Sequence, residues 1–239
     1  MRSNILCGKI YIYNGQSDIK AYFWNTLRGE YIEEVKKLQK MGIETYTFDQ
    51  GDCQRYNMKY NAQPYPYLEN IYFDSSEIKY DCYFCAADKD RLLTLIKLKN
   101  ALKDQNISFN FKVLKEKHKN YSKESSDIEG IKLIDKFVDY TIVLKESSHA
   151  SCIVELLMKG QSGYTLRTME SLFLNKKLIT NNKNVVNESF YNPNNIFILD
   201  NNYDKIKKFL EIPYETVPKY EKEKYSCNSW MNRFFEVEK

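Results

Sequence analysis

Residues that could bind an anion occur in two stretches of the 239-residue chain. The first, AADKDR (86–91), places Lys89 and Arg91 directly after an apolar run. The second, GQSGYTLRTMES (160–171), places two glycines before an apolar pattern with helical spacing. Glycines let a backbone approach a ligand closely, and the N–H groups in the first turn of a helix can hold a phosphate. Both stretches therefore indicate sites for a phosphorylated ligand.

Each stretch also has a purely structural interpretation. Lys89 and Arg91 can face water, although a cation at a helix N-terminus opposes the helix dipole by about 0.3–1 kcal/mol. In the second stretch, Thr165 can act as an N-cap, and Arg167 with Glu170 can form an ordinary i,i+3 ion pair. The pattern is neither a Walker loop nor a GxGxxG fingerprint. Spacing alone leaves both interpretations open.

Two carboxylates, Asp49 and Asp52, follow the apolar stretch YTF (46–48). A carboxylate that leaves a strand could face a cleft and act as a general base. It could equally cap a turn or a helix through its side-chain oxygens. The two residues are therefore candidates for a base, with capping as the alternative.

The cysteines and histidines do not predict a metal site. Six cysteines are scattered, and only Cys82 and Cys85 form a CxxC pattern. They lie in YDCYFCAAD, which is typical of a buried strand, so their side chains would point to opposite faces. His118 and His149 are the only histidines. We expect reduced, mostly buried thiols and no bound metal.

Composition limits the class of protein. The 36 basic and 32 acidic residues leave a formal charge of +4, which is too balanced for a nucleic-acid-binding protein. No apolar run approaches the ~18 residues of a membrane span. The first residues lack the apolar region and cleavage site of a signal peptide. We therefore expect a cytoplasmic protein that binds no nucleic acid.

Strands and helices alternate along most of the chain. We expect strands at 19–24, 43–48, 79–87, 107–114, 140–144, 151–156, 177–180 and 195–199. We expect helices at 30–41, 88–105, within 128–140, at 165–174, 202–211 and 226–237. The segment 49–70 is typical of an irregular linker. The alternation from 79 to 211 predicts a doubly wound α/β domain, in which ligands bind beyond the carboxyl ends of the strands.

The chain resembles bacterial glycosyltransferases of the GT-B type that build lipopolysaccharide or capsular polysaccharide. The blocks that carry the resemblance are, in order, YFWN (22–25), YTFDQGDCQRYNMKYN (46–61), YDCYFCAADKDRL (80–92), GQSGYTLRTMESLFLNKKLITNN (160–182) and FYNPNNIFIL (190–199). The block at 160–182 is the most specific. In this family two Rossmann-like domains face a cleft, with the nucleotide-sugar donor on the C-terminal domain and most of the acceptor on the N-terminal domain.

The resemblance implies an α/β, GT-B-like fold with one complete Rossmann-like C-terminal domain and a partial N-terminal α/β unit. The implied domains are an acceptor-side unit at 1–77, a donor-binding domain at 78–225, and a C-terminal helix at 226–239 that packs back on the first unit. Only about 75 residues precede the donor-binding domain, whereas a domain of usual size has on the order of 100–200. We therefore expect leading strands of the N-terminal domain to be missing, and no catalytic base is assigned.

The resemblance also implies roles for single residues. Glu170 matches the glutamate that binds the ribose hydroxyls of the donor, because a carboxylate accepts two hydrogen bonds. The backbone N–H groups of Gly163, Tyr164 and Thr165 would face the diphosphate.

Basic side chains would neutralise the same diphosphate. Lys89 and Arg91 match a basic pair that stabilises the leaving group as the sugar–phosphate bond breaks, and Arg167 could assist. This chemistry is metal-independent. Further candidates for the pocket, each with a structural alternative, are Glu155, Gln161 and Asn181.

The expected function is thus transfer of a sugar from a nucleotide-sugar donor to a cell-surface glycan or a lipid-linked glycan. The nucleotide-sugar is a substrate, and no cofactor is expected. Peripheral association with the inner face of the membrane and formation of an oligomer would both fit this role. The alternative is a non-catalytic nucleotide- or phosphate-binding module, or a subunit that completes its cleft with another chain. An unrelated α/β domain of the flavodoxin or receiver type would need acidic or hydroxyl-rich loops that are not evident.

Overall fold

The computed structural model describes residues 9–14, 18–66, 77–121 and 128–235. The described residues form two compact units. Unit 1 takes its residues from Met1–Tyr67, Gly160–Thr165 and Lys219–Lys239, and unit 2 takes its residues from Leu68–Lys159 and Leu166–Pro218. The domain boundaries expected from the sequence stay a prediction. The units differ from them in grouping 160–165 and 219–225 with the N-terminal residues.

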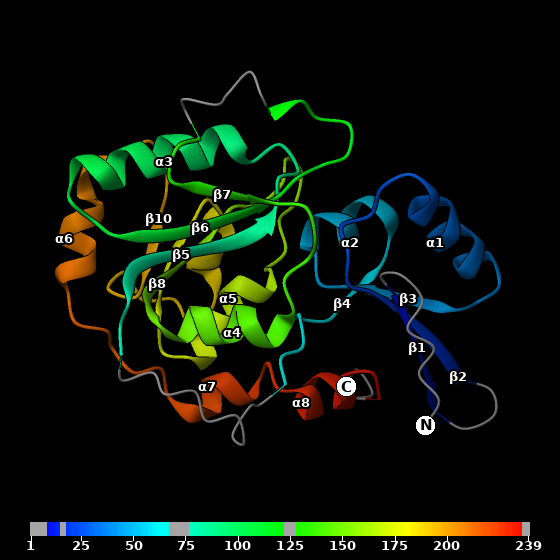
Figure 1. Ribbon diagram of the computed structural model, residues 1–239. Coiled ribbons are helices and arrows are strands. Elements are labelled where there is room, and N and C mark those ends of the chain that lie inside the picture. The colour runs from blue at the N-terminus through cyan, green and yellow to red at the C-terminus, as the bar shows by residue number, and fades with distance from the viewer. Residues whose placement is uncertain (1–8, 15–17, 67–76, 122–127, 236–239) are drawn as a thin grey trace. The chain divides into compact units, whose positions relative to one another are not determined.

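A parallel sheet forms the centre of unit 2 (Figure 1). Within the described residues its six strands are β5 (Tyr80–Ala87), β6 (Phe109–Leu114), β7 (Ile131–Ile134), β8 (Ala150–Glu155), β9 (Lys177–Thr180) and β10 (Ile196–Ile198). Their order is β10-β9-β8-β5-β6-β7, with every pair parallel. The chain therefore runs outward from β5 to β7 and returns to β8, which puts the topological switch point between β5 and β8. This confirms the predicted doubly wound α/β fold.

Helices cover both faces of this sheet (Figure 1). They are α3 (Leu92–Asp104), α4 (Tyr140–Ser148), α5 (Leu166–Phe173) and α6 (Ile206–Glu211), with the 3-10 turns η2 (Lys183–Asn187) and η3 (Tyr203–Lys205). Apolar side chains of α3 and α6 pack on one face, and Val143 of α4 packs on the other. This two-sided burial explains why the central strands are almost continuously apolar.

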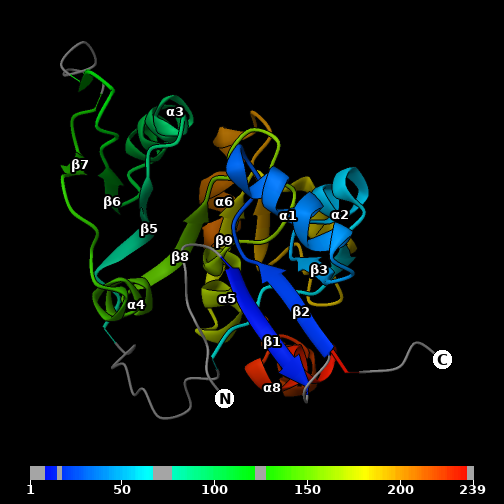
Figure 2. The same ribbon diagram turned by 90° about the vertical axis from the view of Figure 1, so that its right-hand side faces the viewer.

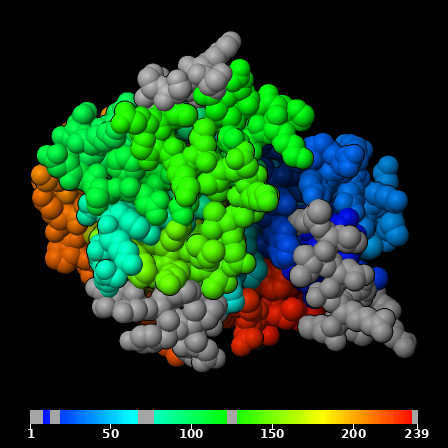
Figure 3. Space-filling view, in the orientation of Figure 1, coloured from blue at the N-terminus to red at the C-terminus, as the bar shows by residue number. Residues whose placement is uncertain are grey.

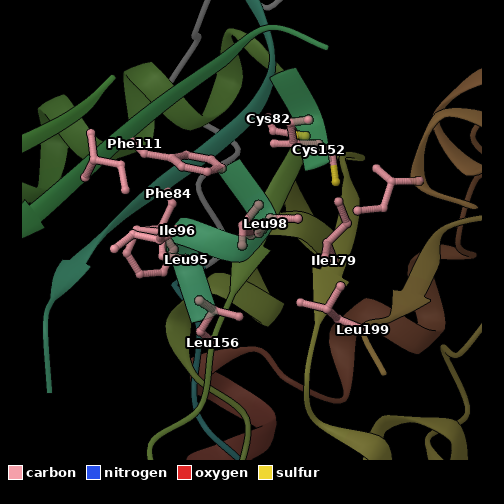
Figure 4. Close-up of a cluster of buried hydrophobic side chains, with 14 of the residues drawn as sticks. Cys82, Phe84, Leu95, Ile96, Leu98, Phe111, Cys152, Leu156, Ile179 and Leu199 are labelled. Atoms are coloured by element: carbon pink, nitrogen blue, oxygen red, sulfur yellow. The ribbon is translucent and has the colours of Figure 1, made fainter. Parts of the chain in front are cut away.

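The main core of unit 2 lies between the sheet and α3. Cys82 and Cys152 occupy paired positions on β5 and β8, and their side chains lie side by side in this core (Figure 4). Leu95 and Leu98 of α3 are fully buried in the same cluster. Cys85 packs on the opposite face of the sheet. The two cysteines of the CxxC pattern therefore point apart, as the alternation of a strand predicts.

Unit 1 has a smaller mixed sheet in the order β1-β2-β3-β4. Among its described residues the elements are β1 (Lys9–Asn14), β2 (Asp18–Phe23), α1 (Glu30–Lys40), β3 (Glu44–Thr47), α2 (Gln50–Tyr56), β4 (Lys59–Tyr60), α7 (Lys219–Glu223) and α8 (Cys227–Asn232). The pair β1–β2 is antiparallel (Figure 2), whereas β2–β3 and β3–β4 are parallel.

Aromatic side chains join the two ends of the chain within unit 1. The ring of Trp230 on α8 lies 4.9 Å from the ring of Tyr22, and the ring of Phe234 lies 4.8 Å from the ring of Tyr46. Both contacts are edge-to-face, which suits the quadrupoles of aromatic rings. On its other side the sheet packs against Val35 and Leu38 of α1. The four-stranded sheet is thus covered on both faces.

Two expected elements of unit 2 are wrong. The predicted strand at 140–144 is the first half of α4, because Asp139 accepts a hydrogen bond from the Thr141 N–H and the buried residues recur at helical spacing. The predicted helix within 128–140 contains β7 instead. There Ile131 and Leu133 face the core at a two-residue period and pair with β6.

The segment 49–70, predicted to be irregular, contains a helix and a strand. α2 starts at Gln50 with Asp49 as its N-cap, and β4 follows it. Only Asp52 is buried among the residues of α2, so the sequence has no apolar stripe that would predict this helix. The strand β1 also lacked a prediction.

The surface of unit 2 carries a few large apolar side chains. Figure 3 shows, in green, much of the outer surface formed by the segment from α3 to α4. In this segment Leu93, Phe137 and Ile142 are exposed. No helix within the described ranges is long and apolar enough to cross a bilayer.

Candidate functional site

The loop after β5 lies at the switch point of the unit 2 sheet, where the fold rule places a ligand. Lys89 and Asp90 have φ values of 43° and 63°, a left-handed conformation that is uncommon for residues other than glycine. α3 begins only at Leu92, so Lys89 and Arg91 precede the helix rather than forming its first turn. The prediction that both cations lie in the first helical turn is therefore wrong.

Asp88 holds this loop. Its Oδ1 accepts hydrogen bonds from the backbone N–H groups of Arg91 (3.2 Å) and Leu92 (3.1 Å), which caps α3. Its Oδ2 lies 2.9 Å from Lys119 Nζ and 2.9 Å from the Tyr121 hydroxyl. Burial raises the pKa of Asp88, but the bonds from Lys119 and Tyr121 outweigh burial and hold the pKa below its usual value. Asp88 is therefore charged at neutral pH.

Arg91 connects the ends of β5 and β8. Its Nη1 donates to the Leu156 carbonyl at 2.9 Å, its Nε donates to the Asp88 carbonyl at 3.1 Å, and its Nη2 donates to the Ala87 carbonyl. Burial lowers the pKa of Arg91, although it stays a cation. A guanidinium has five N–H donors, so these bonds leave two for a ligand. Arg91 is thus a structural brace with some capacity to bind an anion.

Glu170 and Arg167 lie on α5. Glu170 is 0% exposed, and its Oε1 lies 2.7 Å from Arg167 Nη2 and 3.1 Å from the Tyr140 hydroxyl. Its Oε2 makes no hydrogen bond of normal geometry within the described residues, although the Ser147 hydroxyl is near enough to favour the charged form. An acceptor oxygen in this state could take a hydroxyl of a ligand once the covering side chains move.

The pKa of Glu170 reflects this incomplete set of partners. Burial raises the pKa of Glu170, and the charge of Arg167 offsets only part of that rise. The resulting pKa of Glu170 is about 7. Burial lowers the pKa of Arg167, but Glu170 outweighs it and leaves the pKa raised. The pair thus combines a permanent cation with a carboxyl group that titrates near neutral pH.

The further pocket candidates of unit 2, Glu155 and Asn181, make hydrogen bonds to other residues of the same unit. Glu155 accepts one hydrogen bond from Thr168 Oγ1 and one from Thr180 Oγ1, each at 2.7 Å. These bonds tie β8 to α5 and β9. Asn181 Oδ1 accepts a hydrogen bond from the Leu157 N–H at 2.7 Å. Their structural alternatives therefore account for the contacts of Glu155 and Asn181.

The loop 160–165 belongs to unit 1 and is bound there by Asp49. Asp49 Oδ2 accepts from the backbone N–H groups of Ser162 (2.8 Å) and Gly163 (3.0 Å). Its Oδ1 accepts from the Ser162 hydroxyl at 2.5 Å. The Gly163 N–H, expected to face a diphosphate, is thus already used. Gln161 donates only within the loop, from Nε2 to the Gly163 carbonyl at 3.3 Å.

Gly163 also lies too close to its neighbours for any side chain. A Cβ at this position would lie 2.6 Å from Phe48 Cδ2 and 2.8 Å from the Phe48 carbonyl oxygen. Tyr164 beside it is buried. The glycine is therefore required for packing of the loop against Phe48, the residue that follows β3, and not only for access to a ligand.

Asp52 also binds the backbone. Its Oδ2 accepts from the Leu27 N–H at 3.0 Å, and Arg55 Nη2 lies 3.5 Å from its Oδ1. Burial raises the pKa of Asp52, and the charge of Asp49 adds to the rise. Both Asp49 and Asp52 are 0% exposed. Asp49 caps α2, as the capping alternative states, whereas Asp52 binds a backbone N–H far along the chain. A role as base stays a prediction for both.

Ser162, Phe48 and Tyr140 also belong to these sites, although no pattern in the sequence singled them out. Ser162 lies between two glycines in the quoted motif, but its partner is 113 residues away. In the described part of the chain, no group of three or more His, Cys, Asp or Glu side chains could hold a metal.

No family model and no curated protein matches the chain. Solved structures do match. AviGT4, a glycosyltransferase involved in avilamycin A biosynthesis, aligns with a TM-score of 0.58 and 8% identity over 81% of this chain and 66% of its own. A variant of TarM from S. aureus, solved with UDP, aligns with a TM-score of 0.55 and 14% identity over 86% of this chain and 45% of its own.

A third neighbour is WaaB, described as a lipopolysaccharide outer core galactosyltransferase. It aligns with a TM-score of 0.53 and 9% identity over 84% of this chain and 70% of its own. The chain spans 66% and 45% of the lengths of AviGT4 and TarM. At these identities the likeness concerns the fold alone: the chain has a GT-B-like α/β glycosyltransferase fold.

Proposed function

We propose that the protein transfers a sugar from a nucleotide-sugar donor to a cell-surface glycan or a lipid-linked glycan. The observation that carries the proposal is the fold, which glycosyltransferases match over more than four fifths of this chain. The TarM structure contains UDP, and WaaB acts on lipopolysaccharide according to its description. These neighbours support a nucleotide-sugar donor and a surface glycan as acceptor.

Glu170 is the residue through which we propose recognition of the nucleoside. Its Oε2 is a buried acceptor without a normal hydrogen bond in the described residues, which is costly unless a donor arrives. A ribose offers two neighbouring hydroxyls that fit one carboxylate. Arg167 at 2.7 Å would keep the carboxylate charged when the ligand binds.

The proposed diphosphate contacts come from fewer residues than the sequence predicts. Gly163 is excluded as a donor in this conformation, because its N–H is bonded to Asp49. Tyr164 and Thr165 follow it, and Lys89 lies in the loop after β5. Arg91 keeps two N–H donors beyond its bonds to backbone carbonyls. Lys89 and Arg91 of unit 2 would stabilise the charge on the leaving diphosphate.

A second candidate is a nucleotide-binding subunit that completes its site with another chain. The observation that favours it concerns the two candidates for a catalytic base. Asp49 and Asp52 have their carboxylates engaged with backbone N–H groups. Release of nucleoside diphosphate from the donor would distinguish a transferase from this alternative.

A thermal-shift panel of UDP-, GDP-, CDP- and TDP-sugars tests the shared claim. Binding to the native state stabilises it by about 2.7 kcal/mol at a ligand concentration of 100 Kd. We expect one nucleotide class to raise the Tm of the wild type, and Glu170→Gln to lose most of that shift. Glu211→Gln, an exposed glutamate of unit 2, is the matched control and should keep it. Absence of a shift with every nucleotide would overturn the proposal.

A further inference from the structure

Asp49 makes an unusually complete set of hydrogen bonds with the loop 160–165. The described residues give it four: the Ser162 hydroxyl (2.5 Å) and the Asp52 N–H (3.1 Å) on Oδ1, and the N–H groups of Ser162 (2.8 Å) and Gly163 (3.0 Å) on Oδ2. A carboxylate has about four acceptor positions. Donors of the protein therefore occupy all four positions, as expected of a residue that holds the loop.

The start of α2 surrounds the loop with further contacts. The Gly51 N–H donates to Ser162 Oγ at 2.9 Å, and Arg55 Nη2 donates to the Gly160 carbonyl at 3.0 Å. A Cβ on Gly51 would lie 2.8 Å from Arg55 Nη2 and 3.0 Å from Ser162 Oγ. Both ends of the GQSG turn are thus fixed to the same short helix.

The charge of Asp49 is necessary for this arrangement. Burial raises its pKa, but the bonds from Ser162, Gly163 and Asp52 outweigh burial and hold the pKa of Asp49 below its usual value. An asparagine of the same shape has one acceptor oxygen and one NH₂ group. Its NH₂ group would point two hydrogens at N–H or O–H donors, so at least one side of the loop would lose its bonds.

We propose that Asp49 is a positioning residue that sets the conformation of the loop 160–165 so that the backbone at Tyr164 and Thr165 meets the diphosphate of the donor. Thr165 is followed directly by Leu166, the first residue of α5, which carries Glu170. The proposal rests on the proposed function, because it assumes a nucleoside diphosphate as ligand. Asp49 acts through the backbone and does not touch the ligand.

The test compares Asp49→Asn with the wild type by amide hydrogen exchange and by calorimetric binding. The probes are UDP with uridine, or GDP with guanosine, whichever pair the nucleotide-sugar panel selects. We expect exchange at the Ser162 and Gly163 amides to accelerate about 10- to 100-fold, as lost bonds to a charged acceptor imply. The diphosphate should bind about tenfold more weakly, while affinity for the nucleoside stays within about twofold. General loosening of the fold would instead weaken the binding of the diphosphate and of the nucleoside to the same extent.

Asp52→Asn is the matched control for exchange. This carboxylate lies on the same helix and is equally buried, but it binds the Leu27 N–H and has no direct hydrogen bond to the loop among the described residues. Exchange at Ser162 and Gly163 should stay near the wild-type rate in this variant. If Asp49→Asn does not fold, Ser162→Ala gives the same comparison, because it removes the hydroxyl that bonds the Gly51 N–H and Asp49.

The outcomes separate the two proposals. Unchanged exchange in Asp49→Asn, or faster exchange with unchanged diphosphate affinity, would overturn the positioning role. Equal weakening of diphosphate and nucleoside would also overturn it. If the wild type binds no nucleotide at all, the proposed function fails, and the exchange data still show whether Asp49 holds the loop.

Discussion

Burial raises the pKa of two carboxylates, Asp49 in unit 1 and Glu170 in unit 2, but only at Asp49 do hydrogen bonds outweigh it. Both are 0% exposed. Four hydrogen bonds from the described residues hold the pKa of Asp49 low, whereas Glu170 has one cation and one hydroxyl on Oε1 and a pKa raised to about 7. The contrast shows that the number of donors, and not burial itself, decides whether a buried carboxylate is structural or open to a ligand.

The largest expected effect follows removal of the Asp49 carboxylate. Asp49→Ala leaves the buried N–H donors of Ser162 and Gly163 without an acceptor and removes the cap of α2. We expect a loss of about 3–5 kcal/mol in the free energy of unfolding of unit 1. Urea denaturation at pH 7 measures it. A loss below 1 kcal/mol would mean that the loop finds other acceptors and that the contrast with Glu170 is wrong.

The second prediction concerns pH and Glu170. Its pKa is about 7 in the folded protein and near 4.5 when exposed, so the folded state binds more protons between these values. The contribution of Glu170 to the free energy of unfolding of unit 2 should therefore be most favourable below pH 4.5. It should fall by about 3 kcal/mol as the pH rises to 7 and beyond. Glu170→Gln should remove this slope in urea denaturation from pH 4.5 to 8. A slope that persists in the variant would assign it to another group.

The contribution of Asp49 to stability should change with pH in the opposite direction. Because its folded pKa is depressed, its contribution to stability is present at neutral pH and is lost as pH falls through the folded value. The difference between wild type and Asp49→Asn should therefore shrink in acid. A difference that grows in acid would contradict the lowered pKa.

A smaller effect is expected for the loop glycines. In Gly163→Ala the new methyl group would meet Phe48 at 2.6 Å, which should cost about 2–3 kcal/mol by overpacking. Gly160→Ala is the comparison, because its Cβ meets nothing within 4 Å and its φ of 83° alone should cost about 1 kcal/mol. Thermal denaturation of both variants measures the difference. Equal costs would show that the loop can move away from Phe48.

The smallest effect is expected at the loop after β5. Lys119 pairs with Asp88, Asp90 and Glu116 but is about one third exposed. Lys119→Met should cost at most about 1 kcal/mol, because solvent and salt screen the pairs with Asp90 and Glu116, and the buried Asp88 keeps its bonds from the Tyr121 hydroxyl and two backbone N–H groups. Added salt should reduce the difference from wild type. A larger, salt-independent loss would show that this ion-pair cluster is as structural as Asp49.

The alternation of apolar segments predicted most of the sheet of unit 2, but not its edge strand β7. β5, α3, β6, β8, α5 and β9 lie close to their expected ranges, because each has a long or continuous apolar pattern. The segment YTIVL was ambiguous, since a short apolar run fits a strand or a buried helix. Its cap at Asp139 decides for the helix. α2 could not be predicted from periodicity, because its only buried residue is a carboxylate.

The candidate site was predictable in part. The motif at 160–171 indicated a loop of special conformation, and Arg167 with Glu170 does form the expected i,i+3 pair. Periodicity cannot show that Asp49 binds this loop, because the partners are 113 residues apart and meet only through the tertiary fold. The hydrogen bond from Arg91 to the Leu156 carbonyl could not be predicted either, because it depends on β5 and β8 being neighbours.

The pH dependence of nucleotide-sugar affinity tests the central claim most directly. The phosphates of a nucleotide-sugar are diesters of constant charge, so a change in affinity reports the protein. If ribose hydroxyls donate to Glu170, binding favours its charged form, and affinity should rise about tenfold from pH 6 to pH 8, with proton release in calorimetry. Glu170→Gln should bind weakly and without this dependence. Affinity that is independent of pH in the wild type, or no binding of any nucleotide-sugar, would contradict the account.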